Sequence, residues 1–199
     1  ALVRLAEEFG FRIQTLQHGV EAFKIASELK ASGVAAVVWS DWGAFKMEAY
    51  DNTTYNARLL MEAGVVTSLH SDNAEISTRM NWEAGKLLRT GVDEIAALST
   101  VTNQSAKAIA IDSRVGSLES GKDADFVIWN GNPLSQFTKA EQTWVDGRRY
   151  FSLDEDTALR AETARQRAQL IQAVLAAAPA ENAPAGAPAR PRGTEGSRR

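Results

Sequence analysis

Apolar runs alternate with helix-like segments over the first third of the chain. Three short segments are predicted to be strands, namely residues 11–17, 34–39 and 65–69. The second of these reads VAAVVW, a continuous apolar run that is typical of a strand covered on both faces. Two helices are predicted between the strands, at residues 20–33 and 53–63, and each is closed by a glycine. This order, with short connections, indicates an α/β fold built from parallel βαβ units.

From residue 77 onward the pattern changes to helices and then to short strands. Two helices are predicted at residues 77–90 and 93–100, and a third begins near Thr102. Three later segments are predicted to be strands, at residues 115–118, 126–129 and 143–145. Because turn sequences such as SGKDAD and GNP separate them, these strands are expected to form a small, separate β layer.

A long helix is predicted near the C-terminal end of the sequence. Ser152 and Glu155 match a capping box, in which the two side chains satisfy backbone amides at the start of a helix. The apolar stripe of this helix consists of Ala164, Ala168, Ile171 and Leu175. Pro179 ends it, so the helix is assigned to residues 152–178. Residues 179–199 are rich in Pro, Ala and Arg without apolar periodicity, and they are predicted to be disordered.

The first residues read as part of an element that is already under way. ALVRLAEEFG has the pattern of the last turns of a helix, with Gly10 at the C-terminal cap. We therefore expect the sequence to be part of a longer protein.

Composition removes several classes of function. The chain is 44% hydrophobic and 24% charged, which is ordinary for a globular protein. Lys and Arg number 22 against 25 Asp and Glu, and this net charge of −3 argues against nucleic acid as the main partner. No apolar run approaches the ~20 residues that span a bilayer, so no membrane interaction is expected. The absence of cysteine excludes disulfides, thiol catalysis and Cys-ligated zinc, and it leaves the cellular compartment open.

Two histidines and one aspartate follow predicted strands. His18 comes directly after residues 11–17, and His70 comes directly after residues 65–69, two positions before Asp72. Ligands of α/β folds bind beyond the carboxyl ends of parallel strands, and strand alternation places His70 and Asp72 on the same side. An imidazole and a carboxylate can bind a divalent metal or move a proton. The other interpretation is that these are polar residues satisfied at the rim of the fold.

The loop of residues 39–52, WSDWGAFKMEAYDN, is dense in aromatic and charged side chains. Loops of this kind at strand ends often shape substrate pockets, which makes Trp42, Lys46 and Tyr50 candidate substrate-binding residues. The alternative is a loop that folds over its own aromatic side chains.

Four segments of the chain read, in order, LQHGVEAFKIASEL, WGAFKMEAYD, VVTSLHSDN and GSLESGKDADFVIWNGNPL. In sequence and in order they resemble the amidohydrolase superfamily, in its imidazolonepropionase-like and prolidase-like branch. The stretch EAGKLLRTGVDEIAALSTVTNQSAKAIAI also resembles the helices that precede the last segment. The resemblance covers roughly residues 1–153. Each motif is moderately specific, and their sequence and spacing together carry the resemblance.

The resemblance implies a (β/α)₈ TIM barrel, of which residues 1–110 supply the C-terminal portion with strands six to eight. Residues 111–151 are implied to be returning strands of a composite β-sandwich, before the C-terminal helix. A histidine at the end of the family's sixth strand binds metal and matches His18. An aspartate at the end of the eighth strand binds metal and handles the proton of the attacking water, and it matches Asp72. His70 lies beside this aspartate and is expected to contact the substrate.

The family's remaining metal ligands, on strands one, four and five, have no counterpart here and are expected upstream of Ala1. The implied activity is hydrolysis of a C–N bond in an amide, lactam or dipeptide-like substrate by metal-activated water. Zinc is the first expected metal, with manganese, iron or cobalt as alternatives. The missing N-terminal half of the barrel is then a required partner.

Two hypotheses from other classes stay open. The chain can be a non-catalytic half-barrel that docks onto an N-terminal half, or onto a second copy as a homo-oligomer, through an open strand edge at residues 11–17. It can also be an unrelated α/β binding module, if the four family-like segments are a coincidence.

Overall fold

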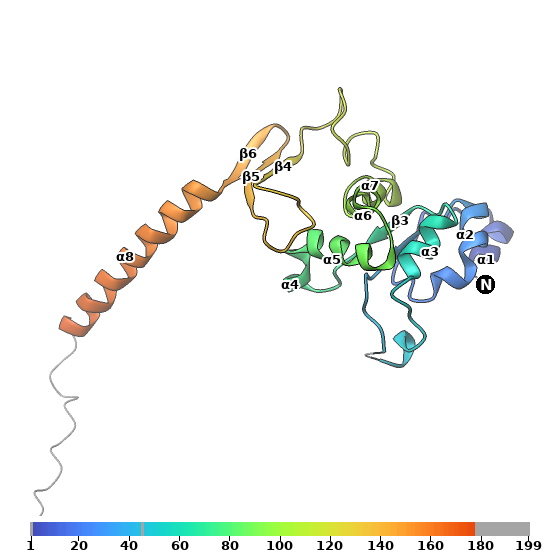
Figure 1. The fold of residues 1–199 in the computed structure, drawn as a ribbon, viewed down its shortest axis with the longest axis horizontal. Coiled ribbons are helices and arrows are strands. Elements are labelled where there is room, and N and C mark those ends of the chain that lie inside the picture. Colours follow the sequence, from blue (N-terminus) through green and yellow to red (C-terminus); the bar gives the residue numbers. More distant parts are fainter. Residues whose placement is uncertain (1, 45, 178–199) are drawn as a thin grey trace, which may run out of the picture. The chain divides into compact units, whose positions relative to one another are not determined.

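The computed structural model describes residues 2–44 and 46–177. These residues form two compact units that divide after Asp156. The first unit contains a parallel sheet with its helices and an antiparallel sheet, and the described part of the second is the remainder of the last helix (Figure 1).

The parallel sheet contains three strands at the positions that the apolar pattern predicts. They are β1 (Thr15–Leu16), β2 (Ala35–Val38) and β3 (Thr67–Leu69), in the order β1-β2-β3. Thr15 pairs with Ala35, and Ala36 pairs with Thr67, both in parallel register. β1 is shorter than the predicted strand because it lies at the edge of the sheet and only two of its residues pair with β2. The α/β class is confirmed.

Helices cover one face of this sheet. They are α1 (Leu2–Phe9), the 3₁₀ turn η1 (Ala22–Ile25), α2 (Ala26–Ser32) and α3 (Asn56–Glu62). Leu29 of α2 and Leu60 of α3 are fully buried in one cluster with Val38 of β2. Burial of a leucine side chain contributes about 1.5–3 kcal/mol, so these contacts hold both helices on the sheet.

The second face of β2 is covered as well. Ala35 and Val37 pack against Ala108 of α7 (Asn103–Ala108), and all four residues of β2 are buried. This arrangement confirms the interpretation of VAAVVW as a strand that is covered on both faces.

The helix predicted at residues 20–33 starts differently from the expectation. Its first turn is the 3₁₀ turn η1, and Ile25 has a non-helical backbone with φ −125° before α2 begins. A tertiary contact explains the change, since the backbone N–H of Phe23 donates to the side chain of Asn56. The end is as predicted, because Gly33 adopts a left-handed conformation with φ 66° and caps α2.

A helical segment connects the two sheets along the chain. It contains α4 (Ala74–Ser77), α5 (Met80–Lys86), the 3₁₀ turn η3 (Leu87–Thr90), α6 (Glu94–Ser99) and α7. The helix predicted at residues 77–90 is present as α5 and η3 but starts at Met80, because Arg79 leaves the helical backbone with φ −138° between α4 and α5. The predicted helix at residues 93–100 and the one that starts near Thr102 are confirmed as α6 and α7.

The antiparallel sheet contains β4 (Phe126–Trp129), β5 (Ala140–Val145) and β6 (Arg148–Ser152), in the order β4-β5-β6. The strand predicted at residues 115–118 is wrong, because the chain turns there and Gly116 has φ 92°. β6 was not predicted. Asp146 and Gly147 between β5 and β6 both have positive φ, 50° and 71°, as a tight hairpin turn requires. The Asp-Gly dipeptide was therefore a hairpin signal and not merely the end of a strand.

The last helix, α8, spans Leu153–Ala177, and none of its residues is buried. Its start is close to the prediction, although Ser152 ends β6. Ile171 and Leu175 of the predicted stripe are 46% and 64% exposed. The predicted helix end at Pro179 and the tail of residues 179–199 lie outside the described residues. No helix among the described residues has both the length and the apolar content needed to cross a membrane.

Candidate metal centre

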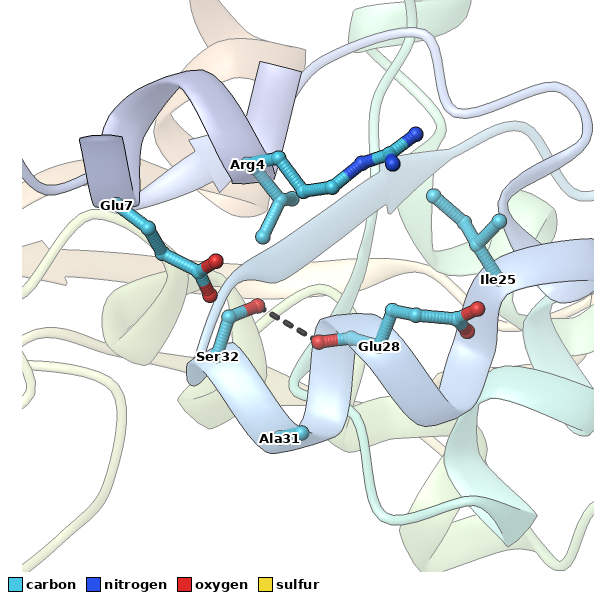
Figure 2. Close-up of a pocket in the computed structure, with 7 residues that line it drawn as sticks. Arg4, Glu7, Ile25, Glu28, Ala31 and Ser32 are labelled. Atoms are coloured by element: carbon cyan, nitrogen blue, oxygen red, sulfur yellow. Dashed lines mark hydrogen bonds between the residues drawn. The ribbon is translucent and has the colours of Figure 1, made fainter. Parts of the chain in front are cut away.

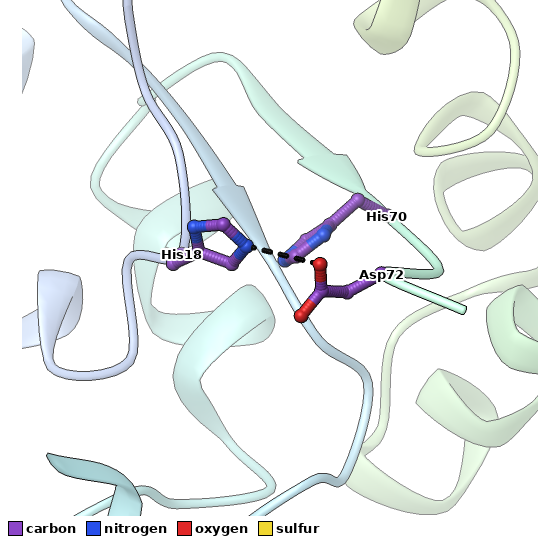
Figure 3. Close-up of side chains that lie close together, drawn as sticks. All are labelled: His18, His70 and Asp72. Atoms are coloured by element: carbon purple, nitrogen blue, oxygen red, sulfur yellow. Dashed lines mark ion pairs between the residues drawn. The ribbon is translucent and has the colours of Figure 1, made fainter.

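His18, His70 and Asp72 lie together where β1 and β3 end. Each offers one ligand atom, and these atoms all lie within 4.8 Å of one another. The Nε2 atom of His18 is 3.4 Å from Oδ1 of Asp72, and Figure 3 shows the three side chains converging on one point. The sequence interpretation that brought these residues to one edge of the sheet is therefore supported by their geometry.

The central strand explains why residues that are distant in sequence meet here. The backbone N–H of Gly19, directly after His18, donates to the carbonyl oxygen of Val37 at 3.0 Å. The backbone N–H of His70 donates to the carbonyl oxygen of Val38 at 3.2 Å. Two consecutive carbonyls at the end of β2 thus hold the two loops that carry the cluster.

Two members of the cluster have unusual backbone conformations. His18 has φ 54° and Asp72 has φ 48°, in the left-handed region. Histidine and aspartate adopt this conformation more often than most residues do. The conformation still costs free energy, and it persists only where the surrounding structure fixes it. β3 ends at Leu69, so strand alternation does not place Asp72. The left-handed conformation of Asp72 directs the Asp72 carboxylate back toward the two histidines.

An indole ring packs against both histidines. The ring centroid of Trp39 lies 4.6 Å from that of His70 and 5.3 Å from that of His18. Trp39 is 4% exposed, and Trp42 stacks on it with a centroid distance of 6.0 Å and an interplanar angle of 5°. The sequence interpretation missed Trp39, although its place at the end of the apolar run VAAVVW, beyond the central strand, was a usable signal.

Burial and the neighbouring His18 both lower the pKa of His70. Desolvation lowers the pKa of the His70 imidazole, and the neighbouring His18 lowers it further, while the carboxylate of Asp72 opposes both. The Nε2 atom of His70 is buried and has no hydrogen-bond partner among the described residues. A neutral imidazole with an unused nitrogen can accept a metal ion or a substrate donor.

The donor set fits a divalent transition metal. Two imidazoles and one carboxylate are among the ligands that zinc takes in catalytic sites. The side chains of His18 and Asp72 are 54% and 50% exposed, so both are accessible from solvent, whereas His70 is half-buried. The orphaned nitrogen of His70 is a second observation that points to a bound group at this position.

The structure separates the three candidate substrate residues of the loop. Trp42 stacks on Trp39, which is the outcome that the self-folded loop predicts, and its backbone carbonyl accepts from Nδ2 of Asn52. Lys46 and Tyr50 flank the 3₁₀ turn η2 (Met47–Ala49), and both are exposed. A role for any of the three in substrate binding stays a prediction.

A hollow elsewhere in the first unit contains neither histidine. It is a groove of about 490 Å³ between α1 and α2, lined by Val3, Arg4, Glu7, Ile25, Glu28, Ala31 and Ser32 (Figure 2). The hydroxyl of Ser32 donates to the backbone carbonyl of Glu28 at 2.7 Å, so it is already partnered within α2. The groove brings together no acid–base pair with an activated nucleophile, and the metal-ligand cluster is the stronger candidate site.

Comparison with known proteins places most of the chain in one family. Residues 14–149 match the amidohydrolase family. The chain is 30% identical over 156 residues to the amidohydrolase tasK of Hapsidospora irregularis, covering 76% of this chain and 16% of that protein. The fold is similar to the crystal structure of an amidohydrolase from Thermotoga maritima MSB8, with a TM-score of 0.71 and 33% identity, over 76% of this chain and 40% of that chain.

A more distant structure shares the fold. An adenosine deaminase from Xanthomonas campestris with bound zinc is similar with a TM-score of 0.56 and 19% identity, over 86% of this chain and 46% of that chain. The chain therefore spans less than half the length of each of these three relatives. The match over residues 14–149 confirms the resemblance of the sequence motifs, and the chain belongs to the amidohydrolase family.

Proposed function

We propose that this chain supplies part of the active site of a metal-dependent hydrolase that cleaves C–N bonds. The observation that carries the proposal is the convergence of His18, His70 and Asp72 at the carboxyl ends of β1 and β3. In parallel α/β barrels this end of the sheet carries the catalytic groups. Membership of the amidohydrolase family supports the reaction class. The substrate class is an amide, lactam or dipeptide-like molecule.

His18 and Asp72 would hold a divalent metal, with His70 beside them. Zinc is the first candidate, supported by the zinc in the similar deaminase, and manganese, iron and cobalt accept the same donors. A bound metal would act as a Lewis acid and would lower the pKa of its water toward neutrality. The unpartnered nitrogen of His70 and the exposed imidazole of His18 fit this role.

Asp72 would move the proton. Its carboxylate accepts a proton from water as the water oxygen bonds to the substrate carbonyl carbon. The same carboxyl group then gives that proton to the nitrogen as the C–N bond breaks, which balances the reaction. His70, Trp42, Lys46 and Tyr50 are proposed to contact the substrate, and Trp39 forms the floor beneath the two imidazoles.

Completion of the barrel is the second part of the proposal. The described chain contains three parallel strands, assigned as strands six to eight of an eight-stranded barrel, and β1 has one strand neighbour. The missing strands and ligands would come from another segment of polypeptide. The alternative function, a non-catalytic half-barrel that serves only as a partner, shares the fold and differs in whether the cluster binds metal.

A zinc titration distinguishes these two functions. The 199-residue chain is titrated in competition with a chromophoric chelator, together with the variants His18→Ala, Asp72→Ala and Asp112→Ala. Asp112 follows α7 and lies outside the cluster, so its variant is the matched control. We expect both cluster variants to weaken zinc binding by tenfold or more and the control to leave it unchanged. Equal affinities in all four proteins would reject a metal centre at this cluster.

A further inference from the structure

A buried amide outside the cluster holds the turn that carries His18. Asn56, the first residue of α3, is 1% exposed. Its Nδ2 donates to the carbonyl oxygens of Gly19 at 2.8 Å and of Val20 at 3.0 Å, and its Oδ1 accepts from the backbone N–H of Phe23 at 3.1 Å. One side chain therefore satisfies three backbone groups in the residues directly after His18.

The orientation of this amide is determined by its partners. Two carbonyl oxygens require the nitrogen end, and one N–H requires the oxygen end, so a flipped amide would lose all three hydrogen bonds. The two ends of the side chain cannot be exchanged, and the contact fixes Asn56 and the turn in one relative position.

The turn requires such support because its backbone is strained. His18 has φ 54°, and its carbonyl oxygen accepts from the N–H of Val20, only two residues later, at 2.7 Å. The turn is also closely packed, since a Cβ added at Gly19 would lie 3.0 Å from Cβ of Ala22 and 3.4 Å from Cγ1 of Val38. Strained conformations persist where the surroundings over-determine them, and here Asn56 supplies three of the contacts.

We propose that Asn56 is a positioning residue that sets the direction of the His18 imidazole toward Asp72 and His70. It acts through the backbone of the turn and is not itself a ligand. The inference rests on the proposed function, because it assigns a purpose to the orientation of a metal-binding histidine. Groups that orient ligands typically change metal affinity by 10–100-fold when they are replaced.

The test compares two asparagines that both donate to backbone carbonyls. Asn56→Leu removes the three hydrogen bonds and keeps the number and branching of the side-chain heavy atoms. Asn81→Leu makes the same exchange outside the cluster, where it removes the 2.6 Å hydrogen bond from Nδ2 of Asn81 to the carbonyl of Pro133. Zinc affinity is measured on the full 199-residue chain by chelator competition. Nuclear Overhauser contacts between the ring protons of His18 and His70, whose centroids lie 4.8 Å apart, are recorded without metal.

We expect Asn56→Leu to lower zinc affinity by about tenfold and to remove the His18–His70 ring contacts, while Asn81→Leu preserves both. Gly19→Ala, which crowds the same turn against Ala22, is the second variant if Asn56→Leu does not fold. It should cause the same two losses.

His18→Ala separates the two proposals, because no loss of zinc affinity in that variant rejects the metal centre itself. The positioning role alone would be overturned by a different pair of results. His18→Ala would lose zinc affinity, while folded Asn56→Leu, or Gly19→Ala if it replaces that variant, would keep full zinc affinity and intact ring contacts.

Discussion

Asp72 occupies a backbone conformation that asparagine tolerates as well as aspartate does, with φ 48°. Asp72→Asn therefore tests chemistry with little effect on folding. In a catalytically competent protein that contains this chain, we expect the variant to retain most of the metal and to lose at least about 100-fold in turnover, because an amide cannot take the proton. The measurement is steady-state hydrolysis of dipeptide and lactam substrates with metal analysis, and Asp112→Asn is the control. Near-parental turnover would remove Asp72 from the mechanism.

A second prediction at the residue scale concerns a buried carboxylate that holds the start of the aromatic loop. Glu83 is 5% exposed and accepts from the hydroxyl of Ser40 at 2.5 Å and from the ammonium of Lys86 at 2.9 Å. Lys86 also donates to Asp41 at 2.9 Å. Lys86→Met leaves the Glu83 charge without its cation, and we expect the free energy of unfolding in urea to fall by about 1–3 kcal/mol.

The pH dependence of the same variant has a definite sign. Burial lowers the pKa of the Lys86 ammonium, but its hydrogen bonds to Glu83 and Asp41 outweigh burial, and the pKa is raised above the usual 10.5. A raised pKa means that the stabilisation is complete below pH 10.5 and is lost as the pH rises through the folded-state value. Parental protein should therefore lose stability in this alkaline range, and Lys86→Met should lack that loss. Lys24→Met, at an exposed ion pair, is the control and should change the neutral-pH stability little.

At the scale of elements, the short helix α4 lies next to the site in sequence. Asn73 follows Asp72 and caps α4, where its side-chain oxygen accepts from the N–H groups of Glu75 at 2.8 Å and Ile76 at 3.1 Å. Asn73→Ala should lower the free energy of unfolding by about 1 kcal/mol, whereas Asn73→Asp retains the cap. Urea titrations of the two variants check this, and equal losses would show that the cap itself is not what stabilises this end of the loop.

Elements that local pattern determines were predictable, and elements that tertiary contacts determine were not. The continuous apolar run VAAVVW predicted β2. The positions of His18 and His70 directly after strands predicted that they lie close together, because parallel strands end at one edge of a sheet. Asn56 could not be identified from the sequence, since its partners lie more than 30 residues away. β6, RRYFS, has no alternation of apolar and polar residues, so the hairpin signal of Asp146 and Gly147 before it was its only local indication.

At the scale of the whole molecule, the three parallel strands provide a limited set of ligands. In the proposed site His18 and Asp72 supply two metal ligands and His70 lies beside them, whereas catalytic zinc is normally held by three protein ligands in fixed geometry. Among the residues that the structure describes, no other group of three histidine, aspartate or glutamate side chains could hold a metal ion. We therefore expect the 199-residue chain alone to bind divalent metal weakly and to hydrolyse no amide. Metal that survives dialysis in stoichiometric amount, together with turnover, would show that the chain is sufficient.

The open edge of β1 should also make the isolated chain associate. β1 has one strand neighbour in the described chain, and unpaired edges recruit further strands. The N–H of Ala35 donates to the carbonyl oxygen of Gln14, so alternation directs the N–H of Thr15 away from β2 and toward the open edge. Phe9 of the preceding α1 is 69% exposed and adds apolar surface nearby in sequence.

Thr15→Pro removes that outward N–H, and it also removes the hydroxyl that donates to the carbonyl of Ala108. Thr15→Val removes only the hydroxyl and keeps the N–H, which makes it the matched control. Sedimentation velocity over a range of concentrations should show association in the parental chain and in Thr15→Val, and a shift toward monomer in Thr15→Pro. Association that is identical in all three proteins would place the contact between copies away from β1.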